Sequence, residues 1–188
     1  MIPFRASAAL LCALCLGSAT AVDAAGVIEY RGVPLGASES VWSEKINDIP
    51  CERPPKSMER HADRYCSAFG SKIQFGGVIA RYVTANFIND RFARLNVALK
   101  PEDFSAVVAA LAEKFGPPTS VETPEFKTRG GLVTTNTIAI WLIGDGKIVA
   151  EKFSTAIDTA HVQYIDNPSS KVLEERRKKA VTEAAKTL

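Results

Sequence analysis

Cysteines and histidines are the residues of this chain best suited to redox, metal or nucleophilic chemistry, and it has four and two of them. Cys12 and Cys15 lie in an apolar N-terminal run, whereas Cys51 and Cys66 lie further along the chain. The second pair lacks the Cys-x-x-Cys spacing of a redox-active site. We therefore predict a structural disulfide between Cys51 and Cys66, which closes a loop of about 15 residues and contributes ~3 kcal/mol in the chain-entropy model.

The two histidines do not suggest a metal centre, because the thiols that could join them are expected to be oxidised. His61 lies between Arg60 and Arg64 and is expected to be a surface histidine. His161 lies in an alternating segment and is expected at a sheet surface or half-buried. We therefore predict no metal and no cofactor.

The usual hydrolase patterns are also missing from the sequence. There is no Gly-x-Ser-x-Gly motif, and Gly36-Ala37-Ser38 is better explained as the start of a helix. A glycosidase needs two paired carboxylates, and the candidates Glu102 and Asp103 are adequately explained by the electrostatics of a helix start. Gly76-Gly77 and Gly130-Gly131 do not follow the strand-then-helix pattern of a phosphate loop. The sequence therefore predicts no catalytic residue.

Two basic segments are candidates for binding a partner. One is the loop between the cysteines, and the other is the C-terminal tail, where a narrow stripe of small apolar residues would allow weak contact with a membrane surface. A solvated loop and a solvated helix are the simpler explanations of the two segments. The candidate partner-binding residues are Arg53, Lys56, Arg60, Arg64, Arg176, Arg177, Lys178 and Lys179.

The first 24 residues indicate export. Arg5 precedes an apolar run and small residues, so we predict a signal peptide over 1–24, cleaved after Ala21 or Ala24, and a periplasmic location. A lipoprotein is disfavoured because Leu11 and Leu14 precede the leader cysteines. A buried N-terminal helix, the alternative, would require an amphipathic period that the run lacks.

Charge and hydropathy narrow the classes of partner. The net charge of +2 is too close to zero to predict nucleic-acid binding. No second apolar run reaches about 18 residues, so we predict no transmembrane segment. The oligomeric state and the identity of any protein partner stay open.

Three helices are expected. The first begins at Ser38 as N-cap and ends before Pro50. The second has Pro101 at its start, an apolar stripe and Gly116 at its end. The stripe consists of Phe104, Val107, Val108, Leu111 and Phe115. The third is the charged terminal helix over 168–188, and a surface loop is expected over 52–65.

Strand signals follow each of the first two helices. They cover 72–75, 78–88 and 91–99, with an Asn89-Asp90 turn, and then 121–127, 134–143, 147–153 and 160–165. The sequence therefore predicts an α+β domain over 25–167. It would consist of two helix-then-antiparallel-meander repeats, 36–99 and 100–165, that form a two-layer helix-on-sheet domain.

The string Tyr30-Arg31-Gly32-Val33-Pro34-Leu35-Gly36-Ala37-Ser38, the 104–118 segment and the Trp141 strand resemble those of small uncharacterised exported bacterial proteins. The order of parts over 27–165 is similar to the helix-on-sheet modules of the small lipoprotein of the outer-membrane β-barrel assembly machine and of secreted β-lactamase-inhibitory proteins. This chain lacks a lipidated cysteine at its mature N-terminus. The resemblance implies a periplasmic module that contacts other macromolecules and carries over no catalytic residue.

Two functions follow as expectations. The first is a soluble periplasmic binding or accessory module that interacts with a protein and does not catalyse a reaction. A structural or inhibitory partner that docks through the same sheet face is a variant of this function. The alternative is a periplasmic hydrolase whose site is assembled from dispersed residues. A grooved sheet face with exposed aromatic residues would favour the first, and a Ser-His pair or two convergent carboxylates in a pocket would favour the second.

Overall fold

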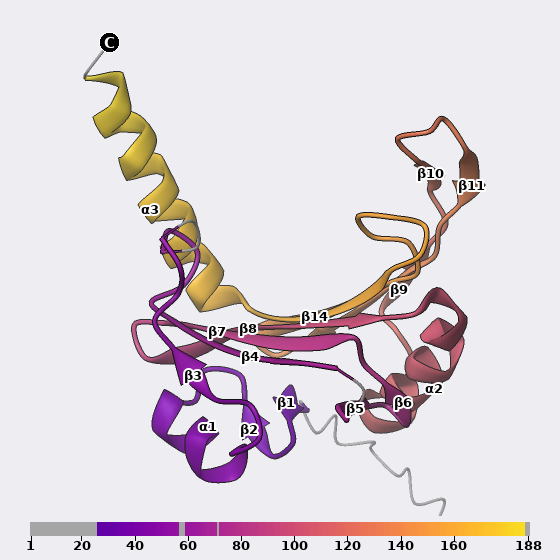
Figure 1. Cartoon of the computed structure of the whole chain (residues 1–188), viewed down its shortest axis with the longest axis horizontal. Helices are drawn as coiled ribbons and strands as arrows, with labels where there is room; N and C mark the ends of the chain where they lie inside the picture. Colours follow the sequence, from indigo (N-terminus) through magenta and orange to yellow (C-terminus); the bar gives the residue numbers. More distant parts are fainter. Residues whose placement is uncertain (1–25, 57–58, 71, 187–188) are drawn as a thin grey trace, which may run out of the picture.

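An antiparallel sheet of eight strands, in the order β3-β4-β7-β8-β14-β13-β12-β9, is the main element of the computed structural model, which describes residues 26–56, 59–70 and 72–186 (Figure 1). The strands are β3 (Cys51–Glu52), β4 (Arg64–Phe69), β7 (Tyr82–Ile88), β8 (Arg91–Leu99), β9 (Ser120–Glu122), β12 (Ile138–Ile143), β13 (Gly146–Glu151) and β14 (Ala160–Asp166). The signal peptide predicted over 1–24 lies outside the described residues.

The sheet has two halves with the same order of elements. In the first half, α1 (Glu39–Lys45) precedes β3, β4, β7 and β8. In the second, a 3-10 turn, η1 (Pro101–Asp103), and α2 (Phe104–Phe115) precede β9, β12, β13 and β14. The last strands of the two halves, β8 and β14, pair at the centre, with Leu99 opposite Ala160. The predicted α+β fold is confirmed, and each meander contributes four strands to one sheet.

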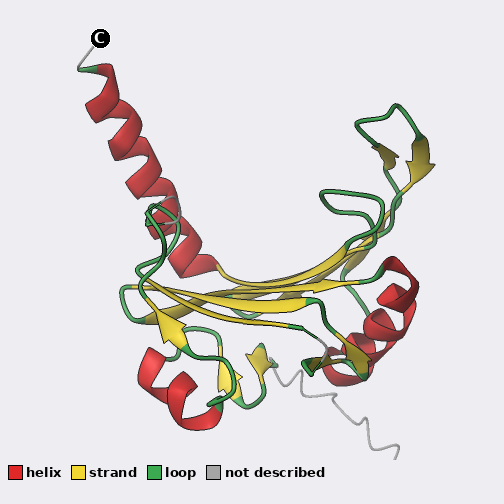
Figure 2. Cartoon of the chain, viewed as in Figure 1, coloured by secondary structure: helices red, strands yellow, loops and turns green. Residues whose placement is uncertain are grey.

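Both α1 and α2 lie under one face of the sheet, which we call the covered face (Figure 2). Side chains alternate along each strand, so every second residue points toward the helices. One cross-strand row of the core runs through Leu95, Tyr164, Ile148 and Trp141, and these residues are almost fully buried. Trp42 of α1 belongs to the same core.

The apolar stripe of α2 is buried as the sequence predicts. Phe104, Val107 and Leu111 enter the core. Gly116 has a φ of 81°, a left-handed conformation that favours glycine, and it ends the helix. The Trp141 indole nitrogen donates a hydrogen bond to the Gly116 carbonyl at 2.8 Å, so the end of α2 is attached to β12.

Three small hairpins surround the main sheet. They are β1 (Glu29–Tyr30) with β2 (Val33–Pro34), β5 (Gln74–Phe75) with β6 (Val78–Ile79), and β10 (Glu125–Lys127) with β11 (Val133–Thr135). The first two lie on the covered side with the helices, whereas the third rises on the opposite side (Figure 1).

The terminal helix α3 (Asn167–Ala185) continues directly from β14 and rises on the side of the β10–β11 hairpin, at the other end of the sheet (Figure 1). Asp166 caps it by accepting a hydrogen bond from the Ser169 backbone nitrogen. Ser169 is buried, Leu173 is half-buried, and every residue from 177 to 186 is exposed. Within the described ranges, no helix is long and apolar enough to cross a membrane.

Several expected boundaries differ from the structure. The strands expected over 121–127 and 134–143 each divide, into β9 and β10 and into β11 and β12, and the strand expected over 72–75 is β5 of a small hairpin. The helix expected over 38–49 ends at Lys45, although Ile46 and Ile49 are still buried. The strand expected over 78–88 divides into β6 and β7, because the chain turns between Ile79 and Tyr82. The loop expected over 52–65 ends in β4, since Arg64 already pairs with Phe87 of β7.

Candidate functional site

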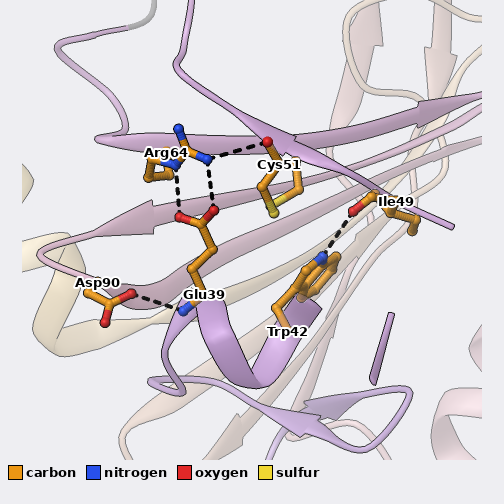
Figure 3. Close-up of a disulfide and its surroundings, with 7 residues drawn as sticks. Glu39, Trp42, Ile49, Cys51, Arg64 and Asp90 are labelled. Carbon is orange, nitrogen blue, oxygen red and sulfur yellow. Dashed lines mark hydrogen bonds and ion pairs between the residues drawn. A yellow bond between two sulfur atoms is a disulfide. The ribbon is translucent and has the colours of Figure 1, made fainter. Parts of the chain in front are cut away.

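The predicted disulfide between Cys51 and Cys66 is present, and it joins residues that face each other across β3 and β4 (Figure 3). Their Cα atoms lie 3.9 Å apart. The Trp42 indole nitrogen donates to the Ile49 carbonyl at 3.2 Å, two residues before the first cysteine. The disulfide therefore fixes the edge strand β3 to β4. It lies close to Ile49, which Trp42 of α1 holds by a hydrogen bond.

Arg64, a candidate partner-binding residue, makes internal contacts instead (Figure 3). Its guanidinium donates to both carboxylate oxygens of Glu39 at 2.8 Å and to the Cys51 carbonyl at 3.3 Å. The hydrogen bond to Glu39 raises the pKa of Arg64. Arg64 thus attaches α1 to the sheet. The other basic candidates of the loop, Arg53, Lys56 and Arg60, are exposed, and the Arg60 Nε donates to His61.

The structure brings the two basic segments together through Arg176 of the tail. Its guanidinium donates to both carboxylate oxygens of Asp63 and to the side-chain oxygen of Asn89. Lys178 pairs with Glu174 one turn earlier on α3. Arg177 and Lys179 are exposed. Of the four basic candidates in the tail, Arg176 is therefore the one that attaches α3 to the domain.

The Asn89-Asp90 turn between β7 and β8 contacts two helices, α1 through Asp90 and α3 through Asn89. Both residues have a positive φ, 50° and 56°, as a two-residue type I′ turn requires. The Asp90 carboxylate accepts a hydrogen bond from the Glu39 backbone nitrogen at 3.0 Å (Figure 3). Ser38 occupies the predicted N-cap position without a side-chain capping bond, so Asp90 supplies the acceptor for α1.

The face of the sheet opposite α1 and α2 lies between α3 and the β10–β11 hairpin, and we call it the open face (Figure 1). Residues that face each other across paired strands share a face, which defines its members from the register. They are Tyr65, Ser67, Phe69, Tyr82, Thr84, Asn86, Arg94, Asn96, Ala98, His161, Gln163, Ile165, Lys147, Val149, Glu151, Ile138, Ile140 and Leu142.

The open face has aromatic and aliphatic margins. Phe69 is 70% exposed, and its ring lies 6.0 Å from the ring of Tyr82. On the opposite margin, Leu142 is 62% exposed. The centre is polar, and Asn96 donates there to Thr84 at 3.2 Å. A face of this composition combines apolar contact area with hydrogen-bonding groups, as protein interfaces do.

The open face also carries a Ser-His pair that the sequence patterns do not identify. The Ser154 hydroxyl lies 3.0 Å from His161 Nδ1, and the Tyr82 hydroxyl lies 2.8 Å from His161 Nε2. Burial lowers the pKa of His161 and raises the pKa of Tyr82. In a nucleophilic triad a carboxylate stabilises the imidazolium. A phenol with a raised pKa stays neutral and does not supply that charge, so the geometry fits a hydrogen-bond chain better than acyl transfer.

A cleft of about 180 Å³ lies where α3 meets the open face. Asn86, Arg94 and Asn96 of the sheet line it, together with Ser170 and Leu173 of α3 and with His61. Arg94 and Asn86 are not among the residues predicted from the sequence. The alternation of apolar and polar residues along β8 does indicate that Arg94 and Asn96 share a face. Leu95, Val97 and Leu99 face the core, which leaves Arg94 and Asn96 on the other side of the sheet.

The described part of the chain contains no group of three or more His, Cys, Asp or Glu residues that could hold a metal ion. No protein-family model, curated protein or solved structure matches this chain. The geometry of the site is therefore the basis for inferring function.

Proposed function

We propose that the chain is a soluble periplasmic binding or accessory module that recognises a partner protein on the open face and does no chemistry. The observation that carries this proposal is the open face itself, which neither α1 nor α2 covers and on which Phe69 and Leu142 are exposed. Single exposed apolar residues are ordinary, but here they flank one continuous surface with a polar centre.

The apolar leader and the disulfide support the location. The leader has the composition of a cleaved signal peptide, and disulfides persist in oxidising compartments such as the periplasm. Fusion of residues 1–26 to a reporter that is active only after export tests this part separately. Retention of the reporter in the cytoplasm would contradict it.

Capture with matched surface variants tests the partner face. The immobilised chain is exposed to periplasmic extract beside a variant that carries Phe69→Asp and Leu142→Asp. A protein bound by the original chain should be lost from the variant, because charges at both margins must be desolvated on binding. Ile79→Asp is the control, since Ile79 is 54% exposed on β6 of the covered side. Equal capture by all three chains would contradict a role of the open face.

A hydrolase is the second candidate, because Ser154 and His161 are within hydrogen-bonding distance. Ser154 would be its nucleophile and His161 its base. A fluorophosphonate probe that labels the chain, but not a Ser154→Ala variant, would support this function. Ser67→Ala, on the same face, is the control. Absence of labelling favours the binding module.

A further inference from the structure

The cleft beneath the start of α3 contains a cation without a counter-ion. Arg94 lines it, and no residue of the described lining is acidic. Across the described residues, the Arg94 guanidinium has no hydrogen bond and no ion pair, whereas Arg64, Arg91 and Arg176 each hold a carboxylate. Burial alone lowers the pKa of Arg94. A desolvated charge of this kind is costly, and a bound anion would offset that cost.

Asn86 supplies a second polar group next to Arg94. The two residues face each other across β7 and β8. Asn86 is 8% exposed, and its Oδ1 atom is buried with no hydrogen-bond partner among the described residues. No such bond holds the amide in one orientation, and the torsion that turns it is soft. Asn86 can therefore turn a donor or an acceptor toward a ligand.

The start of α3 does not provide this site by itself. Asp166 accepts from the Ser169 backbone and hydroxyl, so the helix end already has its cap. Arg91 binds the same carboxylate at 3.2 Å. These contacts occupy Asp166, and Arg94 keeps its donors for a ligand.

The size and walls of the cleft limit the ligand further. A volume of about 180 Å³ lies below the range of about 300–1,000 Å³ that is typical of pockets for drug-sized ligands, so the cleft suits a smaller ligand. Ile88, Ala93 and Leu173 form an apolar wall. A single guanidinium matches one carboxylate, whose two oxygens fit its planar fork.

We propose that this cleft binds a small carboxylate with a hydrogen-bond donor next to the carboxyl group. The Arg94 guanidinium binds the carboxylate, and the Asn86 side-chain oxygen accepts a hydrogen bond from the neighbouring donor. The apolar wall contacts a short side chain. A free 2-hydroxy acid and the last residue of a peptide share this chemistry. The sheet residues of the cleft, Asn86, Arg94 and Asn96, belong to the open face, but binding of the carboxylate does not require that a protein partner binds there.

Nuclear magnetic resonance titration of the purified chain tests the proposal. The probes are L-lactate, acetyl-trialanine with a free carboxylate, its amide, and inorganic phosphate. L-Lactate or the free peptide acid should shift the Arg94 Nε–H and Asn86 side-chain signals saturably, at concentrations up to about 50 mM. Whichever of these two probes binds more tightly identifies the source of the carboxylate: L-lactate indicates a free acid, and the peptide acid indicates a chain end.

Variants identify the atoms involved. Arg94→Gln should weaken binding at least tenfold, and Arg94→Lys, which keeps the charge without the fork, should have a smaller effect. Arg81→Gln is the control, because Arg81 pairs with Asp158 away from the cleft. Four results would overturn the proposal: no saturable shift, unchanged binding by Arg94→Gln, equal binding of the peptide amide, or equal binding of phosphate.

Discussion

Arg176 donates to both carboxylate oxygens of Asp63, at 2.7 and 3.0 Å, although 113 residues separate the two side chains. The pair is the main polar contact between α3 and the loop that follows β3. It also determines which part of the terminal helix belongs to the domain, because every residue from 177 to 186 is exposed.

Arg176→Ala should destabilise the chain by ~0.5–1 kcal/mol at neutral pH, because the pair is partly exposed and screened by salt. The hydrogen bond from Arg176 lowers the pKa of Asp63. The contribution is thus present above the usual carboxyl pKa of about 3.9 and is lost as the pH falls through the lowered value. Urea midpoints at pH 7 and pH 2 measure this. Lys178→Ala, which breaks only the exposed Glu174 pair, should change neither midpoint.

Removal of the cap that Asp90 provides should loosen α1. Asp90→Gly keeps the positive φ of the turn and removes the acceptor for the Glu39 nitrogen, at an expected cost of about 0.5–1.5 kcal/mol. Asp90→Asn retains both the acceptor and a residue that tolerates this conformation. It should leave the urea midpoint unchanged, and an equal loss in both variants would contradict the role of the acceptor.

The disulfide should leave neither Cys51 nor Cys66 with a free thiol. Labelling of the unfolded, unreduced protein is expected to modify neither Cys51 nor Cys66. Replacement of both by alanine should cost ~3 kcal/mol in urea unfolding. A reductant should lower the midpoint of the original chain and leave that of the double variant unchanged.

Leu111→Ala should cost ~2–5 kcal/mol, since Leu111 is 4% exposed and its removal leaves a cavity under the sheet. Glu113→Ala, two residues along on the exposed side of α2, is the matched control. If urea unfolding gives the same midpoint for both variants, the α2 stripe is not part of the core.

His161 should make the chain sensitive to mild acid. Burial lowers its pKa, so the folded state favours the neutral imidazole more than the unfolded state does. Its contribution is complete above about pH 6.5 and decreases as the pH falls from there toward the lowered value. His161→Gln should therefore flatten the fall in urea midpoint between pH 7.5 and pH 5. A His161→Gln variant whose urea midpoint falls as steeply as that of the original chain would contradict this role of His161.

Much of the fold follows from local patterns in the sequence. The α2 stripe, the Gly116 end and the Asn89-Asp90 turn each depend on neighbouring residues, and the structure confirms them. The sequence does not indicate β4, because its residues Arg64 to Phe69 show no regular alternation of apolar and polar side chains. Its place is fixed by pairing with β7 and by the disulfide.

The site was less predictable, because it depends on contacts between distant segments. Arg64 and Arg176 have the composition of solvated basic residues, and their partners Glu39 and Asp63 lie 25 and 113 residues away. Arg94 differs from Arg64 and Arg176 because, within the described residues, it has no carboxylate partner. Its neighbours in sequence indicate a strand, but the absence of a carboxylate near it becomes visible only when β7, β8 and α3 are assembled.

The two outer strands of the sheet are short, with two residues in β3 and three in β9. Pro50 precedes β3, and Pro118 and Pro124 lie on either side of β9. Proline has no amide hydrogen, so it cannot donate a backbone hydrogen bond to a strand from another molecule. Short outer strands next to proline therefore give β3 and β9 few backbone donors with which to pair edge to edge at high concentration.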